Sequence, residues 1–189
     1  MNPEILIGLP GIKELVNLYA LPPEALDAES IIKTLANINR FNGRGTRRIS
    51  VLHHSIFVAS ILKAWNSSPG IVLGGFCHDF AEAFTGDVIK PIKDYCPELE
   101  AIELSIIGQM SFHFNIGLPL NKAVKEAERL ALCFEALHSG FIIDKWGLYA
   151  AKFIKADVAF NQLLQDSLAY SVADALALLS ELQDFTTNQ

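Results

Sequence analysis

One apolar stretch of this sequence carries an imidazole and three carboxylates within ten positions: Phe76-Cys77-His78-Asp79-Phe80-Ala81-Glu82-Ala83-Phe84-Thr85-Gly86-Asp87. A continuous helix over residues 71–84 would place Glu82 one turn beyond both His78 and Asp79. Imidazole and carboxylate groups are common ligands of divalent metals, and the carboxylates of Glu82 and Asp87 can also move protons. The stretch favours a metal-dependent active site, and the alternative is a helix end with a solvated polar face.

Helical periodicity dominates the chain on both sides of this stretch, without alternating strands or a repeat of fixed length. The pattern predicts an all-α fold, a single-domain helical bundle over residues 1–189. Asp27, Ser50 and Asn121 are expected at the start of helices, and Gly86 is expected to end one. The predicted helices cover residues 12–19, 28–38, 51–65, 71–84, 97–114, 121–138, 147–166 and 171–182.

The composition restricts the class of protein. Hydrophobic residues make up 51% of the 189 positions and charged residues 19%, which excludes a disordered chain and is enough for a large core. The net charge of −6 argues against general binding to nucleic acid or to acidic membranes. Three cysteines without a CxxC motif, and no visible signal peptide or spanning segment, predict a cytoplasmic protein. The apolar excess also favours a homo-oligomer.

Histidine and acidic residues on three predicted helices form a candidate metal-ligand set. His54, the pair His78 and Asp79, and Glu128 can meet at one point inside a helical bundle. Two histidines and two carboxylates suit one divalent transition metal, such as Zn, Co or Mn, better than calcium. The neighbouring His53 points about 100° away on the same helix and is expected to face solvent or to support the site.

Basic residues near this set could bind phosphate. The glycine-containing loop over residues 39–48 bears four arginines, and guanidinium groups bind phosphate oxygens in pairs. The alternative for this loop is a solvated basic turn. Lys90 and Lys93 could line the same cavity, whereas Glu98, Glu100 and Glu103 are expected to form a solvated face.

In this order and spacing, the motifs resemble those of the HD-domain metal-dependent phosphohydrolases. The resemblance is closest to bacterial 5′-deoxynucleotidases and to phage-type HD hydrolases, a branch that includes a phage dATP triphosphohydrolase. It covers residues 36–135, with the C-terminal helices of residues 141–183 beyond it. The motifs that carry it are Arg40-Phe41-Asn42-Gly43, Ser50-Val51-Leu52-His53-His54-Ser55, the stretch from Cys77 to Asp87, Lys90-Pro91-Ile92-Lys93 and Ala123-Val124-Lys125-Glu126-Ala127-Glu128.

The resemblance implies a role for each matching residue. The implied metal ligands are His54, His78, Asp79 and Glu128. Glu82 would be the catalytic acid or base, and Asp87 a second catalytic or substrate-orienting carboxylate. Arg40 would contact phosphate or sugar, Phe41 would pack on the sugar and help to exclude a ribose 2′-hydroxyl, and Lys93 would hold phosphate.

The implied activity is removal of the 5′ phosphate group or groups from a deoxynucleotide, in a bacterial or phage-infected cytosol. A dNMP and a dNTP, including dATP, both remain open as the substrate. The family's last metal ligand is usually aspartate, whereas this chain has Glu128. The alternative is therefore a nucleotide-binding or regulatory homologue with little turnover, and a third possibility is a structural interaction protein that binds neither metal nor nucleotide.

Overall fold

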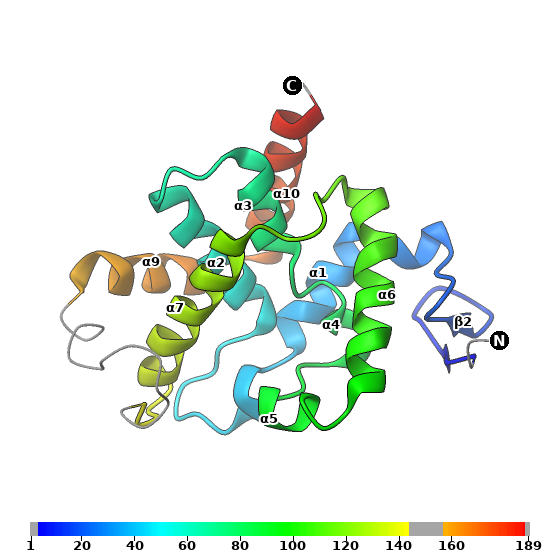
Figure 1. Cartoon of the computed structure of the whole chain (residues 1–189), viewed down its shortest axis with the longest axis horizontal. Helices are drawn as coiled ribbons and strands as arrows, with labels where there is room; N and C mark the ends of the chain where they lie inside the picture. The colour runs from blue at the N-terminus through cyan, green and yellow to red at the C-terminus, as the bar shows by residue number, and fades with distance from the viewer. Residues whose placement is uncertain (1–3, 144–156, 188–189) are drawn as a thin grey trace.

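The computed structural model describes residues 4–143 and 157–187. Helices form nearly all of the regular structure in these ranges, and a two-stranded sheet lies near the N-terminus (Figure 1). The prediction of an all-α fold is therefore confirmed. The elements are β1 (Leu6–Ile7), β2 (Val16–Asn17), η1 (Pro23–Leu26), α1 (Ala28–Asn37), η2 (Arg40–Gly43), α2 (Val51–Ala64), α3 (Pro69–Cys77), α4 (Glu82–Thr85), α5 (Lys90–Lys93), α6 (Pro97–Phe114), α7 (Lys122–His138), α9 (Val158–Leu168) and α10 (Val172–Thr187).

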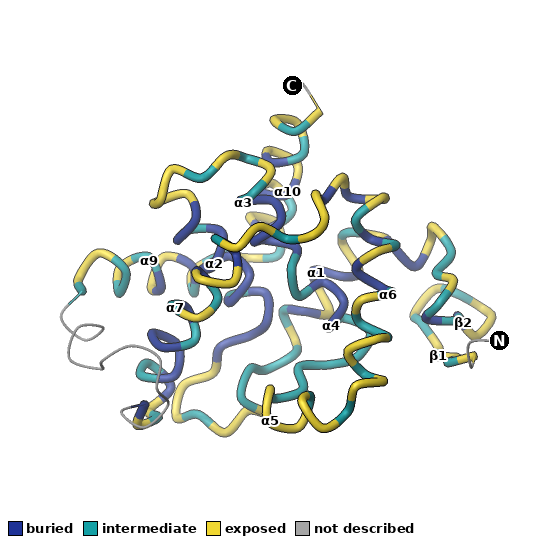
Figure 2. The backbone as a smooth tube through the Cα atoms, viewed as in Figure 1, coloured by how far each residue is buried: buried dark blue, intermediate teal, exposed yellow. Residues whose placement is uncertain are grey.

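The helix α2 lies at the centre of the molecule, between α7 and α9 on one side and α1 on the other (Figure 1). Much of this helix is buried (Figure 2). Its buried apolar residues lie on all sides, and they include Leu52, Ile56 and Phe57. A helix that is apolar around most of its circumference is stable only inside a core. The side-chain hydroxyl of Ser50 accepts a hydrogen bond from the His53 amide and begins α2 at the predicted residue.

The helices α2 and α3 form an antiparallel hairpin joined by a short turn over residues 65–68. They approach closely at Gly75, where an added Cβ would lie 2.2 Å from Leu62 Cδ1. Because the two helices are antiparallel, the first turn of α2 lies beside the last turn of α3. This pairing brings together two histidines that are far apart in the sequence.

The predicted continuous helix over residues 71–84 is wrong. The helix α3 ends at Cys77, and a tight turn over residues 78–81 separates it from the short helix α4. In this turn the amides of Phe80 and Glu82 donate to carbonyls only three residues earlier, those of Cys77 and Asp79. Such bonds tighten the chain relative to an α-helix and change the direction of the following side chains. The predicted stop at Gly86 is confirmed, because this residue ends α4 with φ +79°.

The predicted helix over residues 12–19 is also wrong, because this region forms an antiparallel hairpin. Strand β2 pairs with β1, and Ile7 lies opposite Val16. Val16 and Leu18 are buried while Asn17 between them is only partly buried, which is the two-residue alternation of a strand. The hairpin rests against α6, since the Gln109 side chain bonds to the backbone of Leu18 and Leu21.

The other helix predictions agree with the structure where it describes the chain. Asp27 and Asn121 cap α1 and α7, and α6 has the predicted bounds. Residues 147–156 of the next predicted helix lie outside the described residues, and α9 begins at Val158. The last helix, α10, extends beyond its predicted end to Thr187. Across the described ranges, every helix is too short or too polar to cross a membrane.

Candidate metal centre

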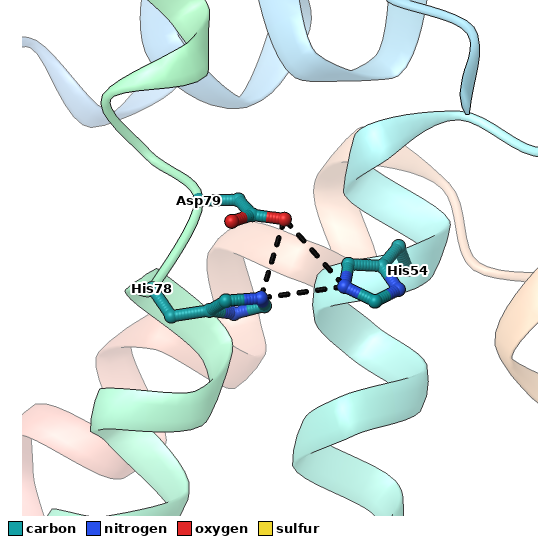
Figure 3. Close-up of side chains that lie close together, drawn as sticks. All are labelled: His54, His78 and Asp79. Carbon is teal, nitrogen blue, oxygen red and sulfur yellow. Dashed lines mark hydrogen bonds and ion pairs between the residues drawn. The ribbon is translucent and has the colours of Figure 1, made fainter. Parts of the chain in front are cut away.

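Three side chains converge where the first turn of α2 meets the end of α3 (Figure 3). The Nε2 atoms of His54 and His78 are 3.3 Å apart. Asp79 Oδ2 lies 3.5 Å from His54 Nε2 and 3.2 Å from His78 Nε2. The donor atoms of the three residues all lie within 4.8 Å of one another, so a single ion could contact all of them.

The local folding of α2 and α3 explains this convergence. His54 follows the Ser50 cap by one turn and is 1% exposed, so its ring points into the core. His53 is only partly buried, and its Nδ1 lies 3.0 Å from the Ser50 hydroxyl. His78 occupies the C-terminal cap of α3 and is the first residue of the tight turn, and Asp79 is the second. The turn therefore directs the carboxylate of Asp79 back toward both imidazoles.

The other nitrogen of each imidazole is held by an acceptor. His54 Nδ1 lies 2.7 Å from Glu135 Oε1, and His78 Nδ1 lies 2.7 Å from the carbonyl oxygen of Gly75. A backbone carbonyl and an ionised carboxylate can only accept hydrogen bonds. Each Nδ1 therefore carries the hydrogen. In the neutral rings both Nε2 lone pairs then face each other and Asp79. Three converging lone pairs require a proton or a cation between them, and two imidazoles with a carboxylate fit a divalent transition metal.

The charges of the group are strongly coupled. Burial disfavours the imidazolium of His78, but Asp79 and then Glu128 outweigh burial and raise the pKa of His78 to about 9. Burial likewise disfavours the carboxylate of Asp79, but His78, His54 and Arg40 hold its pKa well below the usual range. The site is therefore built to hold positive charge next to an ionised Asp79.

Glu128 lies at the edge of the group. Its Oε1 is 3.8 Å from His78 Nε2, and 42% of its side chain is exposed. The other three residues form the close set of donor atoms. Helix α7 thus brings Glu128 next to the site, and its role as a fourth ligand remains a prediction.

Glu82 is a buried carboxylate beside the metal-ligand group. It is 5% exposed, and its Oε2 has no hydrogen-bond partner among the described residues. Burial, followed by repulsion from Asp79 and Asp87, raises the pKa of Glu82 to about 9. In the metal-free protein these neighbours favour the protonated form of Glu82, which can donate a proton. It lines a cavity of about 200 Å³, together with residues that include His78, Asp79 and Lys93.

The predicted phosphate-binding cations contact carboxylates at this site. Arg40 Nη1 lies 3.7 Å from Asp79 Oδ2 and 3.9 Å from Asp87 Oδ1, so Asp87 also joins the cluster. Burial opposes the charge of Arg40, but Glu135 and the two aspartates outweigh it and raise its pKa further. Burial raises the pKa of Asp87. The neighbouring charge of Arg40 lowers it by less, so the pKa stays above its usual value.

Lys93 and Phe41 flank the same region. Lys93 Nζ lies 3.4 Å from Glu82 Oε1 and 2.9 Å from Glu103 Oε2. Phe41 has φ +57°, an unusual value for a bulky residue, and its ring centroid is 5.0 Å from that of Phe141. The Arg40 guanidinium carbon lies 5.8 Å from the Phe41 ring centroid.

Two acidic residues of the site escape sequence reasoning. Glu103 was expected on a solvated face, but that expectation is wrong, because its side chain is 15% exposed and accepts from Thr85 and Lys93. Glu135 is completely buried and contacts His54. A signal for Glu135 does exist: it interrupts an apolar run and follows Glu128 by seven residues, which places both on one face of α7.

A scan against protein-family models and a search of the curated proteins both find no match for this chain. The chemistry of the site is therefore inferred from its own side chains.

Proposed function

We propose that this chain is a metal-dependent phosphohydrolase that removes the 5′ phosphate group or groups from a deoxynucleotide. The observation that carries the proposal is the convergence of His54 Nε2, His78 Nε2 and Asp79 Oδ2 beside a buried Glu82. The choice of a deoxynucleotide rests on the resemblance of the motifs to the HD-domain phosphohydrolases. A dNMP and a dNTP, dATP included, are both candidate substrates.

The residues that would hold one divalent metal are His54, His78, Asp79 and, at the edge, Glu128. A metal bound there supplies Lewis-acid activation of water and of a phosphoryl oxygen. Bonds from the two Nδ1 atoms to Glu135 and to a backbone carbonyl hold both imidazoles in the orientation that ligation requires.

We assign Glu82 the role of general acid. Without a bound metal, burial and the two neighbouring aspartates raise the pKa of Glu82 to about 9 and favour its protonated form. When water attacks phosphorus and the bond to the 5′ oxygen breaks, Glu82 gives its proton to that leaving oxygen, and the resulting carboxylate takes up the proton that the attacking water releases. The cavity that Glu82 shares with the metal-ligand group supports this position for the scissile bond.

We assign Arg40 and Lys93 to bind the phosphate oxygens of the substrate. Both cations already contact carboxylates of the site at distances of 2.9–3.9 Å, so phosphate would compete with or join these contacts. Charge-assisted hydrogen bonds from guanidinium and ammonium groups offset the negative charge that grows on phosphate in the transition state. Asp87 then holds Arg40 in place, and Phe41 beside it is assigned to pack against the sugar.

The first experiment is chromatographic product analysis after manganese- or cobalt-loaded protein is mixed with a panel of dNMPs and dNTPs. Deoxynucleoside plus phosphate from dNMPs would identify a 5′-deoxynucleotidase, and deoxynucleoside plus triphosphate from dNTPs would identify a triphosphohydrolase. Metal-loaded protein that yields no deoxynucleoside from any of these substrates would overturn the proposal.

The variant Glu82→Gln tests the assigned acid. We expect kcat to fall about 10²- to 10⁴-fold because the glutamine amide cannot supply the proton. Bound metal, measured by elemental analysis, is expected to stay unchanged. The exposed Glu98 on α6 gives a matched control, since Glu98→Gln removes a carboxylate away from the site. Full turnover by Glu82→Gln with metal retained would eliminate this role.

One observation favours a second candidate, a nucleotide-binding homologue with little turnover. The Glu128 side chain is 42% exposed, and its Oε1 comes no closer than 3.8 Å to His78 Nε2. A weakly held metal would leave nucleotide binding to Arg40 and Lys93 without efficient hydrolysis. Equilibrium dialysis separates the two: protein that binds a deoxynucleotide but retains no Mn²⁺ supports the binding homologue.

A further inference from the structure

A buried carboxylate on α7 contacts both a metal-ligand candidate and a substrate-binding candidate. Glu135 is 0% exposed, its Oε1 lies 2.7 Å from His54 Nδ1, and its Oε2 lies 3.3 Å from Arg40 Nε. Burial disfavours its charge, but His54 and Arg40 outweigh burial and lower the pKa of Glu135. A buried carboxylate is stable only with such partners, so its position is closely determined by these two contacts.

The contact with His54 determines what the ring offers to the site. Because Glu135 Oε1 accepts from Nδ1, the lone pair of His54 lies on Nε2, which faces His78 and Asp79. Without this acceptor the ring could rotate or carry its hydrogen on Nε2. Carboxylates that bind the distant nitrogen of a ligating histidine commonly raise metal affinity by about 10- to 100-fold.

The contact with Arg40 is an ion pair that helps to orient the guanidinium. Glu135 Oε2 forms an ion pair on the Nε side of the planar group, without an aligned hydrogen bond, while Nη1 lies toward Asp79 and Asp87. The guanidinium is planar and rigid, so attraction of its Nε edge to Glu135 also favours one direction for the opposite edge. Glu135 therefore connects the histidine of the metal group to the cation assigned to phosphate.

We propose that Glu135 is a positioning residue that orients His54 toward the metal and Arg40 toward phosphate at the same time. This inference rests on the proposed metal-dependent function. It assigns α7 two separate contributions, Glu128 at the edge of the site and Glu135 two turns further along the same face.

The test measures binding rather than turnover. Titration calorimetry with Mn²⁺ gives the metal affinity, and titration of the Mn²⁺-loaded protein with inorganic phosphate gives the affinity of the anion site. For Glu135→Ala we expect Mn²⁺ binding to weaken about 10- to 100-fold, and phosphate binding to weaken as well. Glu126→Gln is the matched control, because it removes an exposed carboxylate from the same helix. An alanine variant with unchanged Mn²⁺ and phosphate affinities would overturn the positioning role.

The conservative variant Glu135→Gln separates the two contacts and serves if the alanine variant does not fold. The amide oxygen can still accept from His54 Nδ1, so Mn²⁺ affinity is expected to stay close to that of the native protein. The neutral amide removes the negative partner on the Nε side of Arg40, so the guanidinium is oriented less well and phosphate affinity is expected to fall. Phosphate binding as tight as in the native protein would contradict the proposal. Native protein that binds no Mn²⁺ would instead overturn the metal-dependent function itself.

Discussion

At the level of single residues, Glu82 has the most unusual environment of the proposed catalytic groups. It is 5% exposed, close to Asp79 and Asp87, and offset only in part by Lys93 at 3.4 Å. Its protonated form is favoured because ionisation would place another negative charge in a poorly solvated cluster. The same feature that would make Glu82 an acid at neutral pH should therefore be visible in the stability of the metal-free protein.

We predict that Glu82→Gln becomes more stable relative to the native protein as the pH rises from about 5 to about 9 in the presence of EDTA. Unfolded Glu82 would lose its proton near its ordinary pKa of 4.5, whereas folded Glu82 would keep it up to about 9. The folded state then binds more protons than the unfolded state, so this group lowers stability as the pH rises. Urea unfolding at several pH values measures the difference, and a difference that does not change with pH would contradict the raised pKa.

At the level of elements, the close packing of α2 on α3 places His78 beside His54. The contact depends on Gly75, where an added Cβ would overlap Leu62 Cδ1 at 2.2 Å. The carbonyl of the same glycine accepts from His78 Nδ1. Packing and ligand orientation therefore depend on one position of α3.

We predict that Gly75→Ala lowers the free energy of unfolding by about 1–3 kcal/mol, because the buried Leu62 must leave its rotamer or the helices must shift apart to admit the methyl group. It should also weaken Mn²⁺ binding as His78 moves with α3. The matched control is Gly108→Ala in α6, where an added Cβ meets nothing within 4 Å. That control should raise stability by about 0.5–1 kcal/mol through helix propensity. Urea denaturation measures both, and equal effects of the two variants would contradict the packing argument.

At the level of the whole molecule, the site exists only when separate segments are assembled. His54 comes from α2, His78 and Asp79 come from the turn that follows α3, and Glu128 comes from α7. The unfolded chain cannot present these donors together, so a bound metal should stabilise the native state by mass action. The homo-oligomer that the apolar composition favours remains a prediction.

We predict that Mn²⁺ at about 100 times its Kd stabilises the native fold by about 2.7 kcal/mol, seen as a higher Tm in calorimetry. Asp79→Asn should abolish most of this shift, since it removes a negatively charged oxygen donor. Asp94→Asn, at an exposed position after α5, should leave the shift unchanged. A Tm that does not respond to Mn²⁺, Co²⁺ or Zn²⁺ would contradict the metal site.

Much of the fold follows from local signals in the sequence. Caps at Asp27, Ser50 and Asn121 and the 3.6-residue apolar pattern predict α1, α2 and α7 nearly at their observed bounds. The same local chemistry marks His54, His78 and Asp79 as a candidate metal group, and the folded chain brings their donor atoms within 4.8 Å. These features can be predicted from the sequence because caps, periodicity and residue type act over a few neighbouring positions.

Only the tertiary structure decided the rest. The turn over residues 78–81, where a helix was expected, redirects Asp79 toward His54, and the hairpin of β1 and β2 replaces an expected helix. Glu135 joins the site because its carboxylate contacts His54 and Arg40, which lie on other elements. Glu103 joins it because its carboxylate contacts Lys93 and accepts a hydrogen bond from Thr85. The sequence by itself determined which groups were available and where most helices begin. Which carboxylate is buried against which cation depends on contacts between distant segments, and desolvation gives those contacts their strength.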